Sequence, residues 1–537
     1  MSLPEALALW LAKRFPAERS LCQRIGHELA SARLDGDTGM LAPPEIHQRL
    51  MACGAASNDP AKAPMTSYRE LLAWSVCAQD EACLATGLLA LAGAAAQQPD
   101  PAQLPWIRVG KDVSQDHAVR TVVERRLAVI VGGPGTGKTT TVLRALSAML
   151  AHRPLRIRLA APTGKAAARL RESIERGLDR ALHAHHLVLR EAAAEATTVH
   201  RLIGWDPGVG RFRLGLRHPL VADLVVVDEA SMVDVHMAAA LIRALPPACR
   251  LVLVGDDAQL PSVEAGAVLR DVVQAAGEGG SLQGCLARLT KVHRQTGDAV
   301  GLRTLAPALR LGDILATEVA LSGGHQDIKR VAHAEAWPVV RTTLEPWIQA
   351  VVGAADPLSA LAELGRMLVL CATREGAWSV ADLHRRIEAM LGARVDGAAP
   401  LHAHARPILI TANDHRLGLA NGDLGVLWSV DGYLSACFPD GQGGLRHLAP
   451  ARLPACETGW VTTVHKAQGS EALSVIVILP PALHPVANRE LLYTAVTRAR
   501  ERVLMVGDER LFAEVLDRQE RRQTGLLARL DQAAATT

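Results

Sequence analysis

The sequence predicts an α/β protein built on parallel sheets, with a mainly helical N-terminal region and a small β-rich insert. From Asp112 onward, short apolar runs alternate with helical patterns, which is typical of a parallel sheet covered by helices on both faces. Residues 406–460 instead hold short strand-like runs separated by Asn-Gly and Pro-Asp-Gly turns. At 537 residues the chain is too long for one core, so several domains are expected.

The composition is that of an ordinary globular protein, with 49% hydrophobic and 21% charged residues. Nine scattered cysteines form no C-x-x-C pair, which favours a reducing compartment over a disulfide framework. The N-terminus lacks a basic leader, and no run of 18 apolar residues occurs. We therefore expect a cytoplasmic protein without a membrane span.

The charge is unevenly distributed along the chain. The net charge is +3, but residues 1–105 carry 8 basic and 11 acidic side chains, so the remainder is more basic than the whole. A mildly basic body fits a protein that contacts phosphates. Phe, Trp and Tyr make up only 3% of the residues, which limits the surfaces available for base stacking.

Residues 1–107 are predicted to form the mainly helical N-terminal domain. The apolar stretch Leu71–Ala95 is expected to be a buried pair of helices, and the Pro-rich stretch 99–105 a linker. Two interpretations stay open for this domain. It docks a partner subunit, or it is a helical cap on the domain that follows.

The clearest motif is the G-x-x-x-x-G-K-T sequence from Gly132 to Thr139. It follows the apolar run Leu127–Val131 and opens a helical pattern, which is the strand–loop–helix context of a phosphate-binding loop. Backbone N–H groups of such a loop wrap a phosphate, while Lys138 reaches the β and γ phosphates and Thr139 holds Mg²⁺. The predicted loop contacts to ATP are Gly132, Gly133, Pro134, Gly135, Thr136, Gly137, Lys138, Thr139 and Thr140.

Polar side chains follow two further predicted strands. The run Val225–Val227 ends in Asp228 and Glu229, and the carboxylate of Asp228 suits the Mg²⁺ that bridges the phosphates. Glu229 is then placed to orient and deprotonate the attacking water. After the run Leu251–Gly255 come Asp256, which could join the outer shell of the metal, and Gln259, which could sense the γ-phosphate.

These motifs, in this order, resemble those of the superfamily-1 helicases. The further matches are APTGKAAAR at 161–169, TVHRLIG at 198–204, LTKVHRQ at 289–295, VTTVHKAQGSE at 461–471 and YTAVTRAR at 493–500. Within the superfamily, the stretches 161–170, 228–269 and 420–427 resemble the RecD family, the alpha subunits of exodeoxyribonuclease V. The resemblance spans about residues 108–510. One departure is His293, which stands where the family usually has an aromatic residue.

The resemblance implies roles for residues that the motif spacing alone does not assign. It implies that Arg294 and the arginine finger Arg498 contact the γ-phosphate, and that Gln115 reads adenine. Further ATP contacts implied by it are Gln468, Gly469 and Glu471. The DNA contacts implied by it are Pro162, Thr163, Lys165, Thr198, His200, Thr463 and His465. Candidate base-stacking residues are Trp205, Trp378 and Trp460.

The resemblance also implies a domain arrangement. Two RecA-like P-loop NTPase motor domains are expected, the first at 108–286 with a small insert at about 177–222. The second is expected at 287–405 and 461–537, interrupted by an SH3-like β-barrel at 406–460. The two motor domains are expected to close over ATP and to open after its hydrolysis.

The implied function is that of an ATP- and Mg²⁺-dependent 5′→3′ DNA helicase. It would act on single-stranded and duplex-end DNA with RecB-like and RecC-like subunits, in a complex that unwinds and degrades DNA ends during double-strand break repair and homologous recombination. A stand-alone RecD-like helicase acting on DNA or RNA is the alternative. The N-terminus has no helix–hairpin–helix glycine pattern, which favours the subunit. A third possibility is a scaffold that ATP merely switches, against which the presence of Glu229, Arg294 and Arg498 argues.

Overall fold

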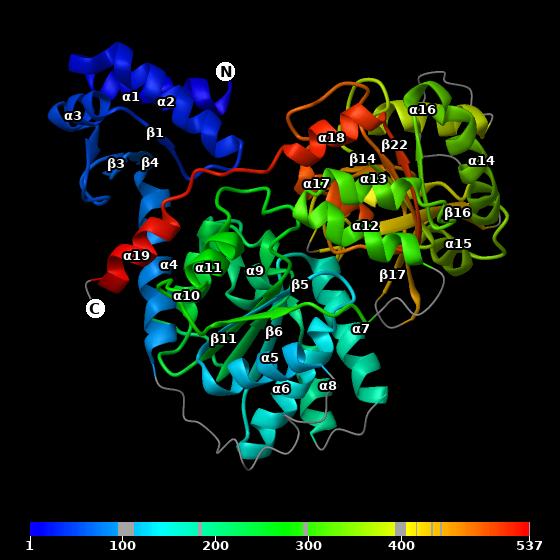
Figure 1. Ribbon diagram of the computed structural model, residues 1–537, viewed down its shortest axis with the longest axis horizontal. Coiled ribbons are helices and arrows are strands. Elements are labelled where there is room, and N and C mark those ends of the chain that lie inside the picture. The colour runs from blue at the N-terminus through cyan, green and yellow to red at the C-terminus, as the bar shows by residue number, and fades with distance from the viewer. Residues whose placement is uncertain are drawn as a thin grey trace. The chain divides into compact units, whose positions relative to one another are not determined.

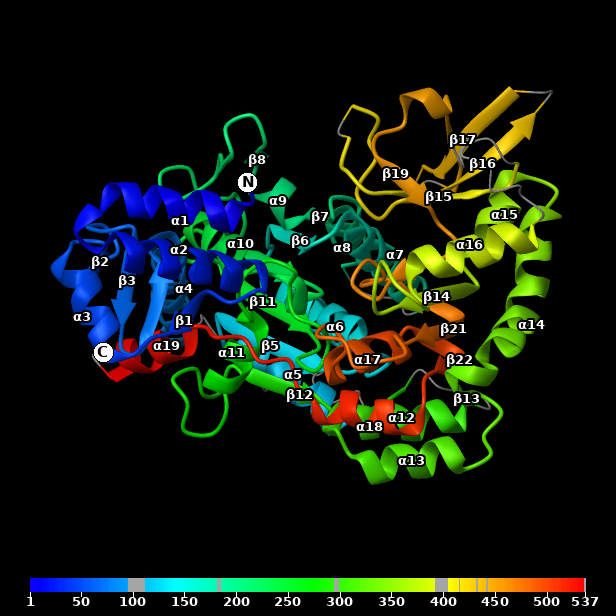
Figure 2. The ribbon, with the colours of Figure 1, turned by 90° about the horizontal axis from the view of Figure 1, so that it is seen from above.

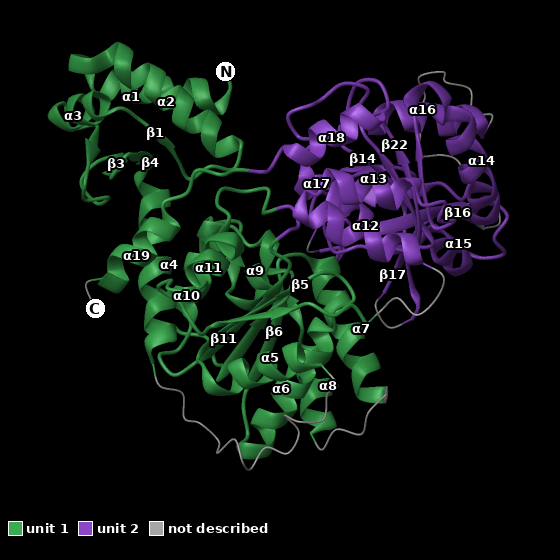
Figure 3. Cartoon of the chain, viewed as in Figure 1, with its two compact units in different colours: residues 1–257, 261–293, 521–537 green, residues 258–260, 294–520 purple. Residues whose placement is uncertain are grey.

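The computed structural model describes residues 1–94, 112–180, 185–293, 299–391, 404–414, 416–430, 433–440 and 443–535. The chain divides into two compact units (Figure 3). Unit 1 comprises Met1–Asp257, Pro261–His293 and Arg521–Thr537, and unit 2 comprises Ala258–Leu260 and Arg294–Glu520. The expected assignment of 461–537 to the second motor domain is therefore wrong for its last segment, which packs within unit 1.

The N-terminal part of unit 1 combines helices with a small sheet (Figure 1). Its sheet has the strand order β1-β4-β3-β2 and was not predicted. The helices are α1 (Leu3–Arg14), α2 (Arg19–Leu34), α3 (Pro44–Ala52) and α4 (Ser75–Gly93), and the strands are β1 (Gly39–Leu41), β2 (Ala56–Ser57), β3 (Met65–Tyr68) and β4 (Leu71–Trp74).

The helix pair expected at Leu71–Ala95 is wrong. Leu71–Trp74 form a strand that pairs with β1 and β3, and one long helix, α4, follows it. A short, continuously apolar run fits a buried strand as well as a helix, so hydrophobicity alone does not distinguish them.

In the described parts of the chain, no helix is both long and apolar enough to cross a membrane.

The larger part of unit 1 is a six-stranded sheet of order β12-β5-β11-β10-β6-β7. Its strand pairs are all parallel. The three strand runs predicted in this region are present as β5, β10 and β11. The strands are β5 (Leu127–Gly132), β6 (Ile157–Ala161), β7 (Thr197–Thr198), β10 (Leu224–Val227), β11 (Arg250–Gly255) and β12 (Leu286–Leu289). The helices include α5 (Val113–Glu124), α6 (Lys138–His152), α7 (Gly164–Arg180), α8 (His186–Ala194), α9 (Val199–Leu202), α10 (Val235–Ala244) and α11 (Val268–Ala275).

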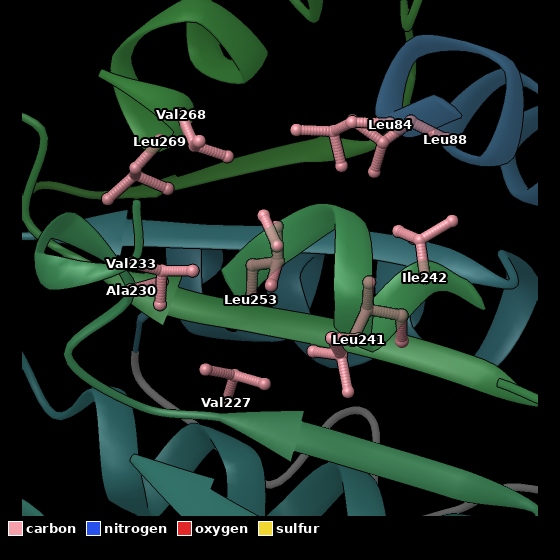
Figure 4. Close-up of a pocket in the computed structure, with 12 residues that line it drawn as sticks. Leu84, Leu88, Val227, Ala230, Val233, Leu241, Ile242, Leu253, Val268 and Leu269 are labelled. Carbon is pink, nitrogen blue, oxygen red and sulfur yellow. The ribbon is translucent and has the colours of Figure 1, made fainter. Parts of the chain in front are cut away.

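Helices cover both faces of this sheet (Figures 1 and 2). On β5, Ala128 and Ile130 join the core formed with α5, α6, α7 and α8, whereas Val129 and Val131 join the core formed with α4, α10 and α11. This alternation is the period-2 pattern of a strand buried on both sides. The second face includes a small apolar cavity of about 20 Å³ lined by residues such as Leu84, Leu253 and Leu269 (Figure 4).

A buried arginine ties helix α5 to strand β11. Arg250 donates from its guanidinium to the carbonyl oxygens of Val122 (3.1 Å), Val123 (2.8 Å) and Arg125 (3.0 Å) at the end of α5. These carbonyls lack partners within the helix, so the guanidinium caps them. Burial lowers the pKa of Arg250 to about 10. The position of α5 matters because this helix carries Gln115.

The C-terminal helix α19 (Leu526–Ala535) packs against α4 and α11 of unit 1. Glu81 of α4 is fully buried and accepts hydrogen bonds from Thr38 Oγ1 (2.6 Å), Gly525 N (2.7 Å) and Arg529 Nε (3.3 Å). A buried carboxylate is tolerated only when such donors surround it. The N-terminal domain and the segment 521–535 therefore depend on each other.

Unit 2 contains a five-stranded parallel sheet of order β13-β22-β21-β14-β20. One face packs on α12, α13, α17 and α18, and the other on α14, α15 and α16. The strands are β13 (Ile328–Val331), β14 (Met367–Cys371), β20 (Thr462–Thr463), β21 (Ala472–Ile478) and β22 (Ala499–Val506). The helices include α12 (Val300–Leu311), α13 (Ile314–Ser322), α14 (His333–Val352), α15 (Pro357–Leu364), α16 (Val380–Met390), α17 (Arg489–Val496) and α18 (Glu509–Asp517).

An antiparallel sheet of order β18-β17-β16-β15-β19 interrupts this second α/β unit. It lies where the β-rich insert was expected, and Phe438, Leu427 and Ile410 form its small core. No pairing among the described residues joins β18 to β19, so closure into an SH3-like barrel stays a prediction. The strands are β15 (Pro407–Ile410), β16 (Leu424–Val430), β17 (Tyr433–Pro439), β18 (Leu445–Leu448) and β19 (Cys456–Thr458).

The attachment of the C-terminal segment predicts a pH-dependent stability. Burial raises the pKa of Asp271 to about 7, although Thr524 donates to its carboxylate at 2.8 Å. The folded protein then holds a proton that the unfolded chain has lost, so the free energy of unfolding falls as pH rises from about 4 to about 7. From pH 5.5 to pH 8, ionisation of Asp271 should lower the free energy of unfolding by about 2 kcal/mol. Asp271→Asn should abolish this decrease when stability is measured by urea unfolding.

The matched control is Asp223→Asn. Arg156 donates to Asp223 and holds its pKa at about 2, well below the tested range, so this change should alter stability equally at both pH values. If Asp271→Asn and wild type lost the same stability between pH 5.5 and 8, the proton would not reside on Asp271.

Candidate functional site

The loop between β5 and α6 has the backbone shape of a phosphate-binding loop. Gly135 and Gly137 adopt φ angles of 78° and 84°, a region that glycine enters without strain. Thr136 Oγ1 donates to the carbonyl of Gly133 at 2.9 Å, and Lys138 Nζ donates to the carbonyls of Gly132 (2.6 Å) and Gly133 (3.2 Å). The ammonium group therefore lies across the loop at the N-terminus of α6, where an anion is favoured.

Gln115 lies directly against this loop. Its side chain is buried, and Nε2 donates to the carbonyl of Thr136 at 3.1 Å. A Cβ atom on Gly137 would lie 2.5 Å from the same Nε2, so glycine is required there by this contact as well as by its φ angle. The structure thus brings Gln115 to the loop, while its contact with adenine stays a prediction.

His293 has a defined place that the sequence analysis did not foresee. Its backbone N–H donates to the carbonyl of Gly135 at 2.7 Å, and its Nε2 pairs with Asp112 Oδ2 at 2.7 Å. Asp112 caps α5 by accepting from Ser114 N at 2.9 Å. Burial acts to raise the pKa of Asp112, but hydrogen bonds from Ser114 and His293 hold it at about 2. His293 therefore braces the loop from the side of α5, which motif spacing could not reveal.

Asp228 and Glu229 follow the strand next to β11, at the same edge of the sheet as the loop. The registers of β10 with β11 and of β11 with β5 place the three carboxyl ends together. Glu229 has φ 51° and donates its N–H to Asp228 Oδ1 at 2.9 Å. Burial and the neighbouring charge of Glu229 raise the pKa of Asp228, while Lys138 and Arg169 oppose the shift.

This donor set fits Mg²⁺. A carboxylate at Asp228 and a hydroxyl at Thr139, one residue after Lys138, are the hard oxygen ligands that this ion prefers. The Asp228 side chain lies close enough to Lys138 for the positive charge of the lysine to oppose the rise in its pKa. Nearby, the buried hydroxyl of Ser231 has no protein partner among the described residues.

The segment after β11 passes from unit 1 into unit 2. Residues Ala258–Leu260 belong to unit 2, where Leu260 lies in the core, accepts from Gln468 Nε2 at 3.2 Å and donates to Thr494 Oγ1 at 2.9 Å. Asp256 is buried in unit 1 and Gln259 is buried within this segment. The predicted γ-phosphate sensor Gln259 is thus part of unit 2.

Unit 2 holds the remaining described residues of the predicted ATP site. Arg498 is buried and donates to the carbonyls of Thr494 (Nε, 3.0 Å) and Ser470 (3.3 Å). Glu471 pairs with Arg500 at 3.0 Å, next to Gly469, whose φ is 73°. Arg294 lies outside the described residues. The predicted ATP residues therefore form one group in each unit.

The predicted DNA contacts of unit 1 gather at the ends of β6 and β7. These strands pair in parallel, with Ala161 opposite Thr198. Thr163 Oγ1 accepts from Ala166 N, and Thr198 Oγ1 accepts from Arg201 N, each at 3.2 Å. Pro162 and Lys165 flank Thr163 at the start of α7, and His200 lies in α9.

The other predicted DNA contacts lie in unit 2. Thr463 ends the short strand β20 and accepts from Lys466 N at 3.4 Å. His465 follows in the turn after that strand. The unit 1 and unit 2 contacts thus each follow a parallel strand of their own sheet.

The prediction of base stacking is wrong for two of the three candidate tryptophans. Trp378 and Trp460 are 8% and 2% exposed and belong to the core of unit 2. Only Trp205, which is 36% exposed, lies at a surface. Isolated tryptophans are more often core residues, and sequence alone does not show which are exposed.

The comparisons with known proteins agree with these motifs. Residues 115–265 match the model of an AAA domain, and residues 458–506 match that of a UvrD-like helicase C-terminal domain. The chain is 42% identical over 435 residues to "RecBCD enzyme subunit RecD" of Mycolicibacterium smegmatis, covering 78% of this chain and 74% of that protein. Identity to the subunit of the same name from Haemophilus influenzae is 32% over 470 residues, covering 77% and 71% of the two chains.

A second kind of relative is the "ATP-dependent RecD2 DNA helicase" of Deinococcus radiodurans, which is 33% identical over 430 residues. That match covers 79% of this chain and 53% of the relative. Among solved structures, Bacteroides Pif1 bound to ssDNA is similar over 73% of this chain and 91% of that one, at 16% identity and a TM-score of 0.41. That likeness is too low to add to the assignment. On the sequence relatives, the chain belongs to the RecD family of superfamily-1 helicases.

Proposed function

We propose that the chain is an ATP-driven motor that moves 5′→3′ on single-stranded DNA, as the RecD subunit of a RecBCD-type exonuclease V complex. The observation that carries the proposal is the meeting of the phosphate-binding loop with Asp228 and Glu229 at one sheet edge, in a chain 42% identical to a RecBCD subunit. The names of the relatives support DNA as the substrate and RecB-like and RecC-like proteins as partners.

The residues of unit 1 account for ATP binding and hydrolysis. Thr139 and Asp228 would hold Mg²⁺, which neutralises charge on the β and γ phosphates when bound. Lys138 would leave the loop carbonyls to contact those phosphates. Glu229 would orient the attacking water and accept its proton. From unit 2, Gln259, Arg294 and Arg498 are proposed to respond to the γ-phosphate.

The residues at the ends of β6, β7 and β20 are proposed to grip the strand without reading its sequence. Their hydroxyl, cationic and imidazole groups suit phosphate oxygens, which position a nucleic acid without specifying its bases. The proposed DNA contacts are Pro162, Thr163, Lys165, Thr198, His200, Thr463 and His465.

We favour the subunit over the stand-alone helicase because the matches cover 74% and 71% of the two RecD subunits, against 53% of the RecD2 helicase. The N-terminal domain is the proposed docking part. Its acidic Asp80 and Glu81 are already engaged within unit 1, so docking would use other residues of its surface.

Lys138→Gln should abolish the ATPase activity that single-stranded DNA stimulates. The side chain that neutralises the transferred phosphate is lost, so kcat should fall by on the order of 100-fold or more. The measurement is steady-state ATP hydrolysis with a saturating oligonucleotide. Lys329→Gln, at an exposed position on the edge strand β13, is the matched control and should retain wild-type activity. Wild-type turnover in Glu229→Gln would contradict a motor and favour an ATP-switched scaffold.

The direction of movement can be read from substrates with a single overhang. A 5′ overhang should be unwound and a blunt or 3′-tailed duplex of the same sequence should not, because a 5′→3′ motor needs a 5′ tail for loading. The measurement is strand displacement with a fluorescent duplex. Unwinding only from the 3′ tail would contradict the polarity, and stimulation by RNA alone would favour an RNA helicase.

The subunit proposal predicts stable partners. Purification of the tagged chain from its native cells should recover two large proteins in equal amounts, identified by mass spectrometry as RecB-like and RecC-like. Recovery of the chain alone, together with strong unwinding by the isolated chain, would instead favour the stand-alone helicase.

A further inference from the structure

A short hairpin beside the proposed DNA contacts presents aromatic rings. Strands β8 (Trp205–Asp206) and β9 (Arg211–Phe212) pair antiparallel, with Trp205 opposite Phe212. The two ring centroids lie 4.8 Å apart. The turn of the hairpin lies at 207–210, where Gly210 has φ 64°.

Two histidines complete a cluster around Phe212. The ring of His200 lies 5.8 Å from Phe212 and 5.9 Å from Trp205, and the ring of His236 lies 5.8 Å from Phe212. Burial lowers the pKa of His200, whereas a hydrogen bond to Asp80 raises the pKa of His236. At neutral pH His236 is therefore the more readily protonated of the two, and a cation against the Phe212 ring is favoured.

The surroundings of this cluster suit a nucleotide. A nucleobase stacks on aromatic rings whatever its identity, while its phosphates favour nearby cations. Four arginines on and beside the hairpin are exposed, and one of them, Arg213, is paired with Asp206 at 3.0 Å. The four are Arg201, Arg211, Arg213 and Arg217.

Asp80 of the N-terminal domain holds the His236 side chain of this cluster in place. It lies in α4, its side chain is only 7% exposed, and its two oxygens pair with His236 Nδ1 and Arg243 at 2.7 Å each. Both partners belong to α10, whose Ile242 comes so near to Gly87 of α4 that a Cβ there would lie 2.2 Å away. Helix α4 is thus locked to α10, and Asp80 fixes the ring that contacts Phe212.

We infer that Asp80 is a positioning residue for single-strand binding, which through His236 holds Phe212 and Trp205 in the arrangement that stacks a nucleobase. The inference rests on the proposed binding of single-stranded DNA. It gives the N-terminal domain a role in DNA binding in addition to any partner docking, because a carboxylate of α4 sets the geometry of a hairpin more than 120 residues later in the chain.

The test compares Asp80→Asn, His236→Phe and the double variant in the full chain. His236→Phe keeps a ring against Phe212 but loses the bond to Asp80. Each single change should raise the oligo(dT) concentration for half-maximal ATPase stimulation by roughly 3- to 10-fold. This is part of the effect expected from losing one whole base–aromatic stacking interaction. Turnover at saturating oligo(dT) should stay within about twofold, because stacking contributes to binding the strand and not to hydrolysis. Both changes break the contact between Asp80 and His236, and Asp80→Asn also breaks the pair with Arg243, so the double variant should bind no more weakly than Asp80→Asn alone.

A second readout reports stacking directly. An oligonucleotide with one 2-aminopurine should lose fluorescence on binding wild type, through stacking on Trp205, and should lose less with Asp80→Asn and least with Trp205→Leu. The matched control Asp223→Asn breaks a carboxylate–arginine pair in the same unit, ahead of β10, and should leave both readouts at wild-type values.

Several results would overturn the inference. Wild-type oligo(dT) dependence in His236→Phe would do so even if Asp80→Asn failed to fold. Additive effects in the double variant, or equal losses in Asp223→Asn, would show general destabilisation instead of positioning. A wild-type protein that did not bind oligo(dT) would contradict the proposed function itself, which is a distinguishable outcome.

Discussion

The parallel order of the unit 1 sheet is the constraint on which the nucleotide site depends. Because β5, β11 and β10 are adjacent and parallel, the segments that leave their carboxyl ends must emerge side by side. The loop after β5 supplies backbone N–H groups and Lys138, and the turn after β10 supplies Asp228 and Glu229. Residues about 90 positions apart in sequence thus share one edge of a sheet. The apolar cores on both faces, and the Arg250 cap on α5, keep that edge in place.

Local sequence was enough to predict what lies along one strand and the loop that follows it. The P-loop, the Asp228–Glu229 turn and the β-rich insert each combine a strand-like run with residues that have one chemical use. Sequence was not enough where a long-range contact decides the outcome. Trp378 and Trp460 carry the same residue type as Trp205, yet only the packing of α14 and α16 shows that they are buried. His293, Arg250 and Asp80 act through partners more than 120 residues away, which no local pattern indicates.

Helix α4 connects the N-terminal domain to the motor through two neighbouring carboxylates. Successive residues of a helix point about 100° apart. Asp80 therefore faces α10 and the hairpin cluster, while Glu81 faces the segment that contains Gly525 and Arg529. Both carboxylates accept from donors outside the N-terminal domain, and Glu81 also accepts from Thr38 within it. The interpretation of that domain as a cap on the motor accounts for part of its role, because its buried carboxylates pair with groups elsewhere in unit 1.

The return of residues 521–535 to unit 1 has a consequence for biosynthesis. During translation, residues 294–520 of unit 2 emerge from the ribosome after β12 and before the segment that supplies Gly525 N and Arg529 to Glu81. Until that late segment is synthesised, either Glu81 stays buried without two of its three hydrogen-bond donors, or α4 stays loosely attached. Domains generally fold as units in the order of their synthesis. Here the first unit to be synthesised is the last to be completed, so the part of α4 that α19 covers stays exposed while residues 294–520 are synthesised.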